Sequence, residues 1–171
     1  MKFENLMDVF HHELRDLHDA EKQLVEALPK MAQAASHGDL KEAFEHHLEE
    51  TKGHVQRVDD ALGELGKSGS SEECKGMKGL IAEGEEVIGM QGDPMAKDAA
   101  LIAAAQRVEH YEIAAYGTVK TLAKELDLSE IEDLMDQTLD EESQADTLLT
   151  KIATGGMLSA GVNQRAGEGD A

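Results

Sequence analysis

The chain has 171 residues, of which 40% are hydrophobic, so it is long enough to fold as one domain around a buried core. Only 3% of the residues are aromatic and two are proline, a composition typical of helices rather than sheets. The 36 acidic residues outnumber the 16 basic ones and give a formal net charge of −20. Such a charge repels phosphate backbones and anionic lipid surfaces, so we expect no nucleic-acid partner and no membrane partner. It is also compatible with a salt-adapted source.

The sequence gives no sign of a targeting or membrane segment. No apolar run approaches the roughly 20 residues that a membrane helix needs, and the first residues lack the apolar stretch of a signal peptide. We therefore expect a cytoplasmic protein. Its single cysteine, Cys74, has no partner for an internal disulfide, and no Cys/His cluster suggests a zinc site.

The first half of the chain predicts two long helices. Apolar residues at alternating spacings of three and four predict a helix over about residues 3–36, and Pro29 predicts a kink or a break within it. Asp39 followed by Glu42 is a capping-box pattern, which predicts a second helix from residue 39 to about residues 63–66. The turn between these two helices is short.

The second half begins with a long connection and continues with two more helices. Residues 67–92 are rich in Gly and Ser and contain one short helical candidate at about residues 78–88. Asp93 followed by Pro94 is a standard helix opening and predicts a third helix. A second capping-box pattern, which opens at Ser129, predicts a fourth helix over about residues 129–153.

This order of elements predicts the fold. Short turns make the first helix antiparallel to the second and the third antiparallel to the fourth, and residues 67–92 are long enough to cross the bundle. The predicted fold class is therefore an all-α, ferritin-like four-helix bundle with a long crossover. We expect residues 1–154 to form this bundle and residues 155–171 to form a flexible tail.

Several acidic residues fall on or beside the hydrophobic faces of the predicted helices. A buried carboxylate is costly unless it is paired, protonated or bound to a metal. The two halves of the chain repeat these positions in three corresponding pairs, which are Glu21 and Glu112, Glu50 and Glu142, and His54 and Asp146. The pattern therefore predicts a pseudo-twofold site inside the bundle.

This site matches a dinuclear metal centre. One Glu from each of two helices and a pair of ligands from each of the other two hold two metal ions in known four-helix bundles. The predicted metal ligands are Glu21 and Glu112 as single glutamates, Glu50 with His54 and Glu142 with Asp146 as pairs, and Glu109 as a further oxygen ligand. The usual pair is Glu-x-x-His at i, i+3, whereas these pairs are at i, i+4, so direct ligation by His54 and by Asp146 is left open.

The ligand types suggest the metals and the chemistry. Two divalent ions, Fe or Mn, would be bridged by Glu50 and Glu142 and would react with O2 or a peroxide. Tyr116, one turn after Glu112, is the candidate catalytic residue, as a hydrogen-bonding or redox-active neighbour of the metals. Five further histidines are expected at the surface, namely His11, His12, His37, His46 and His47. His18 and His110 are intermediate, and a supporting role beside the metal ligands is left open for His18, which aligns with Glu109 in the repeat.

Four segments, residues 17–24, 47–51, 107–116 and 139–142, resemble the YciE/YciF-type family of ferritin-like bacterial and archaeal stress proteins. The most specific of them is the run Glu-His-Tyr-Glu-Ile-Ala-Ala-Tyr that ends at Tyr116. The resemblance covers about residues 3–154. It implies a four-helix bundle with a dinuclear metal centre and a homodimer that forms through helix faces, with a poorly defined physiological reaction.

Two alternatives accompany this interpretation. The acidic residues could form a polar seam that Lys, Arg or water satisfies, with no metal. The protein could also be a non-catalytic stress or scaffold protein that binds iron only incidentally. A hydrolase is not supported, because no Ser lies at a telling spacing from His and Asp.

Overall fold

The structure is a computed structural model that describes residues 2–67, 73–156 and 159–168. Four long helices make up most of it, namely α1 (Leu6–Ala34), α2 (Gly38–Glu64), α4 (Pro94–Glu125) and α5 (Ser129–Thr154). The shorter elements are α3 (Lys75–Gly89), the paired two-residue strands β1 (Gly155–Gly156) and β2 (Ser159–Ala160), and α6 (Val162–Gly167). In the described residues, no helix is both long enough and apolar enough to span a membrane.

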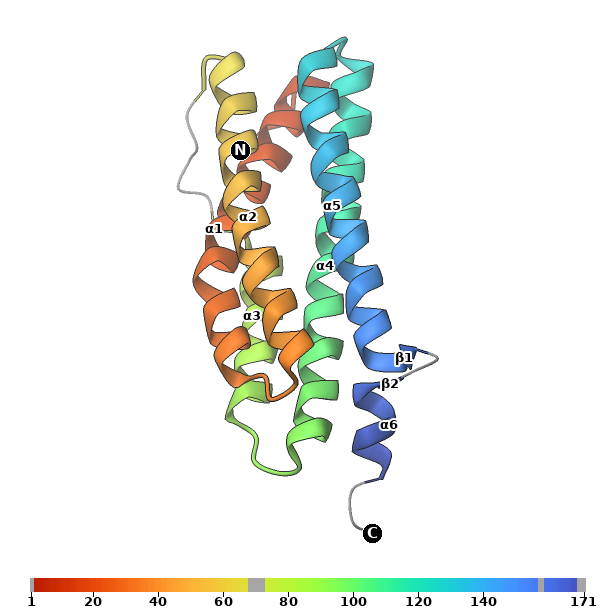
Figure 1. Cartoon of the computed structure of the whole chain (residues 1–171). Coiled ribbons are helices and arrows are strands. Elements are labelled where there is room, and N and C mark those ends of the chain that lie inside the picture. Colours follow the sequence, from red (N-terminus) through yellow and green to blue (C-terminus); the bar gives the residue numbers. More distant parts are fainter. Residues whose placement is uncertain (1, 68–72, 157–158, 169–171) are drawn as a thin grey trace.

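The long helices form the predicted all-α, ferritin-like bundle. Figure 1 shows α1 beside α2 and α4 beside α5. A short turn joins the helices of each pair, and the two turns lie at opposite ends of the bundle. The chain between α2 and α4 travels the length of the bundle, so these two helices run parallel to each other. Helix α3 lies within this crossover and packs against α1 and α4.

Two hydrophobic clusters fill the bundle, one toward each end. One is built around Leu24, Leu40, Phe44, Leu101 and Leu149, and the other around Phe10, Leu14, Val58, Val119 and Met135. Along each long helix, buried polar residues separate the part in one cluster from the part in the other. The core is therefore apolar at both ends and polar in the middle.

The predicted helix ends are partly correct. Asp93 caps α4, as predicted, by accepting a 2.8 Å hydrogen bond from the backbone N–H of Ala96. The capping box predicted for α2 does not form, because α2 begins at Gly38 and its N-cap residue, His37, makes no side-chain cap. The fully buried Asp98 of α4 instead accepts hydrogen bonds from the backbone N–H groups of Ser36 and His37.

Of the kink or break expected at Pro29, the structure excludes the break, since the α-helix continues from Leu6 to Ala34. Helix α5 begins at the predicted Ser129, but its N-cap is Leu128 and no side chain caps it. The short α4–α5 turn contains Asp127 with a φ of 57°, a left-handed conformation that Asp tolerates better than most residues.

The segment expected to be a flexible tail contains regular structure in its described part. Helix α6 packs against α4 and α5, and its first residue, Val162, is fully buried. Gly161 allows this docking, because a Cβ at that position would lie 2.3–2.4 Å from backbone atoms of the segment that ends α5. The chain continues below α5 in Figure 1 and extends the apolar cluster at that end of the bundle.

Candidate metal centre

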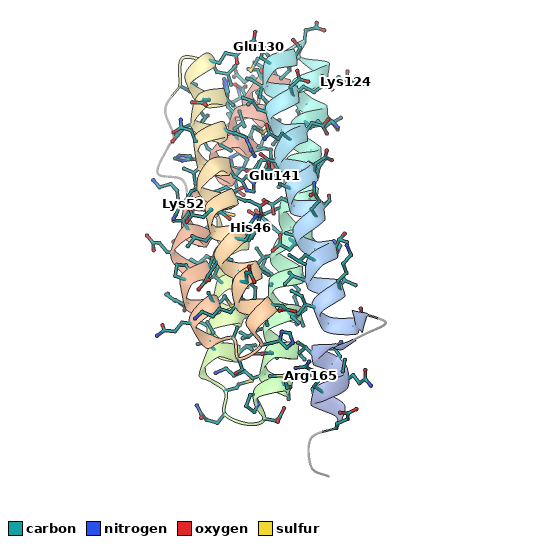
Figure 2. All side chains as sticks on the ribbon, in the orientation of Figure 1. His46, Lys52, Lys124, Glu130, Glu141 and Arg165 are labelled. Atoms are coloured by element: carbon teal, nitrogen blue, oxygen red, sulfur yellow. The ribbon has the colours of Figure 1, made fainter. Side chains whose placement is uncertain are left out.

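The polar middle of the bundle is a cluster of six buried residues. In two groups, one ligand atom of each residue lies within 4.8 Å of those of the others. The first group is His47, Glu109, Glu112 and Glu142, and the second is Glu21, His54 and Glu142. Figure 2 labels His46 of α2 and Glu141 of α5, which lie at this level of the bundle. All four long helices contribute, and Glu142 belongs to both groups, which suits a ligand shared by two metal ions.

His47 points one ring nitrogen at the cluster and the other toward the outside of the bundle. Its Nε2 lies 3.4 Å from Glu142 Oε2 and 3.5 Å from Glu109 Oε2. Its Nδ1 lies 3.3 Å from Oε2 of Glu50, which also lies 3.2 Å from Nδ1 of the exposed His46. Glu50 therefore touches His47 from outside the cluster.

His54 has the same arrangement with its ring nitrogens exchanged. Its Nδ1 lies 2.9 Å from Glu142 Oε1 and 3.5 Å from Glu21 Oε1. Its Nε2 lies 2.9 Å from Oε2 of Glu141, and Arg57 donates two hydrogen bonds to the same carboxylate, at 2.5 and 3.0 Å. A carboxylate that holds the outer nitrogen of a histidine is the usual support of a metal-binding imidazole.

The inward-facing atoms are not satisfied by one another. Within the described residues, eight buried atoms of the six cluster residues have no hydrogen-bond partner, because their close contacts are poorly aligned. They are Glu21 Oε2, His47 Nε2, His54 Nδ1, Glu109 Oε2 and both carboxylate oxygens of Glu112 and Glu142. Native proteins rarely leave so many buried polar atoms unpaired. Oxygen and imidazole nitrogen atoms that converge without hydrogen bonds fit a metal-binding site.

Burial and mutual repulsion shift the pKa values of the acids. Burial is the main cause that raises the pKa of Glu109 and Glu112 well above the usual range, and nearby Glu142 raises both further. The pKa of Glu21 is also raised by burial, against the lowering effect of His54. The pKa of Glu142 is lowered despite burial, because both histidines lie beside it. Without metal, the cluster therefore keeps protons that exposed carboxylates would lose.

The pKa values of the two histidines are raised, although burial by itself would lower them. Burial lowers the pKa of His47, but Glu109, Glu50 and Glu142 outweigh it and raise the pKa to about 9. For His54, Glu142 and Glu21 outweigh burial and raise the pKa to about 10. Protonated histidines thus neutralise part of the acidic charge when no metal is bound.

Of the predicted ligands, Glu21, His54, Glu109, Glu112 and Glu142 lie together in the cluster. Glu50 and Asp146 do not. Glu50 is 28% exposed and contacts the histidines from outside, and Asp146 is 21% exposed and accepts a hydrogen bond from Gln106. Each lies to one side of the inward-facing row of its helix, which explains its exclusion.

Tyr116 is fully buried and touches the cluster through Glu21 rather than through Glu112. Its hydroxyl donates a short hydrogen bond to Glu21 Oε1, and its ring lies 6.3 Å from that of His54. Burial and the charge of Glu21 raise its pKa well above 10. The phenol therefore keeps its proton and remains a hydrogen-bond donor to a candidate ligand.

The placement of His47 at the surface is wrong, since it is only 5% exposed and belongs to the cluster. The sequence does contain a signal for its position. His47 and His54 are two turns apart and lie in one row with the buried residues Phe44, Thr51 and Val58. The acidic residues Glu49 and Glu50, which lie between His47 and Thr51, made this row of buried residues hard to recognise in the sequence.

Two cavities of different character reach the cluster. A cavity of about 300 Å³ between α2 and α5 touches His47, Glu50 and Glu109 and is bordered by exposed polar residues that include His46 and Lys151. A smaller cavity of about 40 Å³ lies among α1, α3 and α4, where it is lined mainly by aliphatic side chains and also reaches His47 and Glu109. The two cavities therefore touch the same two residues, one with a polar border and the other with a mainly aliphatic lining.

The fold and the cluster together define a class, a ferritin-like helical bundle with a buried carboxylate–histidine site. A family described as a domain of unknown function, DUF892, matches residues 5–166, and the chain belongs to this family. The chain is also 46% identical to protein YciF of Escherichia coli over 154 residues, which are 90% of this chain and 93% of YciF. The resemblance inferred from the sequence motifs is thereby confirmed.

Solved structures agree with this placement. The crystal structure of the E. coli stress protein YciF matches with a TM-score of 0.85 over 87% of this chain and 94% of that one. YcfI from Rhodopseudomonas palustris, 41% identical, also gives 0.85 over 88% of this chain and 96% of that one. Ferritin-like diiron-carboxylate proteins from Bacillus anthracis give 0.65 at 16% identity over 88% and 98% of the two chains, which supports the fold alone.

Proposed function

We propose that the protein binds two divalent transition-metal ions in the buried cluster and acts as a dinuclear carboxylate stress protein. The observation that carries this proposal is the set of eight buried ligand atoms without hydrogen-bond partners among the described residues. The two overlapping groups supply one ligand set for each ion, with Glu142 in both. In this assignment His47 takes the position that the sequence pattern gave to Glu50.

Charge balance supports two ions rather than one. Glu21, Glu109, Glu112 and Glu142 carry four negative charges when ionised, and two divalent cations neutralise them while both histidines stay neutral. One ion would leave two of these charges, which only retained protons could neutralise inside the protein. Carboxylate oxygens suit Fe and Mn, and the two imidazoles favour Fe.

We further propose that the reduced metal pair reacts with O2 or a peroxide, to which it supplies electrons. The protein's own side chains hold the metal ions, supply a proton donor and exclude water. Glu21 and Glu112 belong to different ligand groups, and Tyr116 keeps a proton within hydrogen-bond distance of Glu21. The surrounding helices exclude bulk water, since Glu21, Glu112 and Glu142 are fully buried.

The test begins with metal content. The metal-free protein is loaded with Fe(II) without oxygen, freed of excess metal and analysed for elements. We expect two equivalents per chain in the wild type and in Glu49→Gln, and a loss of most of the metal in Glu142→Gln. Retention of two equivalents by Glu142→Gln would refute the assignment of the shared ligand.

Reactivity is tested separately. The Fe(II)-loaded protein is mixed with O2 or hydrogen peroxide in a stopped-flow instrument and compared with free Fe(II). We expect faster oxidation in the protein. Oxidation no faster than in buffer would favour the alternative, a non-catalytic stress or scaffold protein that binds iron incidentally. The homodimer and the cytoplasmic location remain predictions.

A further inference from the structure

The two histidines of the cluster are supported in different ways, and this difference suggests different roles. This inference rests on the proposed function, because it concerns how the metal ions are held and loaded. We propose that Glu141 and Arg57 form a fixed anchor that positions His54, whereas Glu50 is the first ligand that an incoming cation meets on its way to His47. Cations then enter through the cavity between α2 and α5.

Several hydrogen bonds hold the anchor at His54 in place, although the side chain of Glu141 is 23% exposed. The imidazole is fully buried, and its outer nitrogen, Nε2, donates to Glu141 at 2.9 Å. Arg57 donates to both oxygens of Glu141, and Gln137 donates to one of them at 3.1 Å. With Nε2–H held in this way, Nδ1 is the atom that faces Glu21 and Glu142 and that would give up its proton to bind a metal ion. Glu141 thus acts through His54 and is a positioning residue.

The support of His47 has fewer hydrogen-bond partners. Glu50 has no arginine that fixes it among the described residues, and its contacts are with His46 and His47 at 3.2 and 3.3 Å. The exposed fraction of its side chain is 28%, against 7% for His47. Both residues line the cavity of about 300 Å³, which leads inward to Glu109. An acidic side chain thus stands between solvent and the cluster.

The polar cavity suits a cation better than the other approach does. A divalent ion that crossed the aliphatic cavity among α1, α3 and α4 would lose its hydration without compensation. In the α2–α5 cavity, Glu50 can replace a water ligand while the ion is still partly hydrated. Lys151 also lines this cavity and has the opposite effect, because its positive charge repels cations. Glu50 and Lys151 should therefore influence metal loading with opposite signs.

The anchor is tested with Co(II), whose absorption spectrum reports its ligands. We compare Glu141→Gln with Glu49→Gln, an exposed glutamate at a similar level that makes the same change in net charge. Loss of such a support usually lowers metal affinity about 10–100-fold. We expect that loss, faster removal of Co(II) by a chelator and an altered Co(II) spectrum in Glu141→Gln, with both metal-free variants melting within a few degrees of the wild type. Affinity and spectrum equal to those of Glu49→Gln would overturn the anchor.

The loading route is tested by the rate of Co(II) uptake at low ionic strength. Glu50→Gln should slow uptake and Lys151→Gln should accelerate it, each by up to about tenfold, because a single charge at the mouth of a site steers ions mainly through the association rate. Glu49→Gln and Lys52→Gln, which change the same charges outside the cavity, should load at the wild-type rate. At equilibrium all four variants should hold two ions.

Three results separate the outcomes. If Glu50→Gln loads as fast as Glu49→Gln, cations do not pass Glu50 and the route is wrong. If Glu50→Gln holds fewer than two ions at equilibrium, Glu50 is a permanent ligand, which also contradicts the route. If the wild type itself takes up no Co(II) and no Fe(II), the proposed function fails. If the wild type holds two ions and the variants behave like their controls, only this inference is refuted.

Discussion

Binding of metal at the cluster should stabilise the fold strongly. Two sites that bind only the folded chain, each at a free metal concentration of about 100 times its Kd, would add about 2.7 kcal/mol apiece, or about 5 kcal/mol together. In a domain of this size 1 kcal/mol shifts Tm by about 2–4 °C, so we expect a rise of about 10–20 °C on loading. The structure gives the reason, since four carboxylates lie in a site that metal-free protein can neutralise only with protons.

The assay is thermal unfolding followed by circular dichroism, in buffer with a chelator and in buffer with Mn(II) or anaerobic Fe(II). Glu142→Gln should lose most of the rise, because Glu142 belongs to both ligand groups, and Glu49→Gln should keep it. Each variant is compared with its own metal-free form, which removes any effect of the substitution on the bundle itself. Equal Tm values for the metal-free and metal-treated wild type would refute the reasoning and favour a polar seam without metal.

Three further predictions follow from particular contacts. The pKa of His54 is raised to about 10. Its stabilising contribution in the metal-free protein is therefore complete below pH 6.5 and is lost as the pH rises toward 10. We expect Tm to fall over pH 7–9 more steeply without metal than with it. Tyr116→Phe should lower the free energy of unfolding by about 1–3 kcal/mol through the hydrogen bond it removes from Glu21, while elemental analysis still finds two metal ions and stopped-flow oxidation is altered. Asp98→Ala should cost about 1–3 kcal/mol in denaturant titration and leave metal content unchanged, with Asp98→Asn less affected because it keeps an acceptor; equal stability of the three proteins would contradict this role of Asp98.

Local sequence patterns predicted the helices well and their caps less well. Asp93 before Pro94 caps α4 as expected, because both partners of that cap lie within four residues. The turn between α1 and α2 is held instead by Asp98, whose carboxylate comes from another helix more than 60 residues away. No local pattern contains that contact. A capping box in the sequence therefore indicates roughly where a helix starts but not which group holds the turn that precedes it.

The tail shows a similar limit. Residues 155–171 have no hydrophobic periodicity, yet Val162 is fully buried and joins the apolar cluster at that end of the bundle. A single apolar residue followed by polar ones gives a weak helical signal by itself. The docking depends on Gly161, because only glycine allows the backbone to approach so closely there, and that requirement is visible only in three dimensions.

The prediction of the candidate site depended on which residues of α2 face the inside of the bundle. The repeat paired Glu21 with Glu112, and both lie in the cluster, but it assigned the partner of Glu142 to Glu50, which lies outside the cluster. His47 and His54 are seven residues apart and point inward together, whereas Glu50 lies off that row and touches His47 from the side. The halves are therefore unequal, because three of the four cluster carboxylates come from the second half of the chain and both histidines come from α2. Each of the two candidate ligand groups contains one of these histidines, and Glu50 lies beside His47 on the side that is partly exposed to solvent.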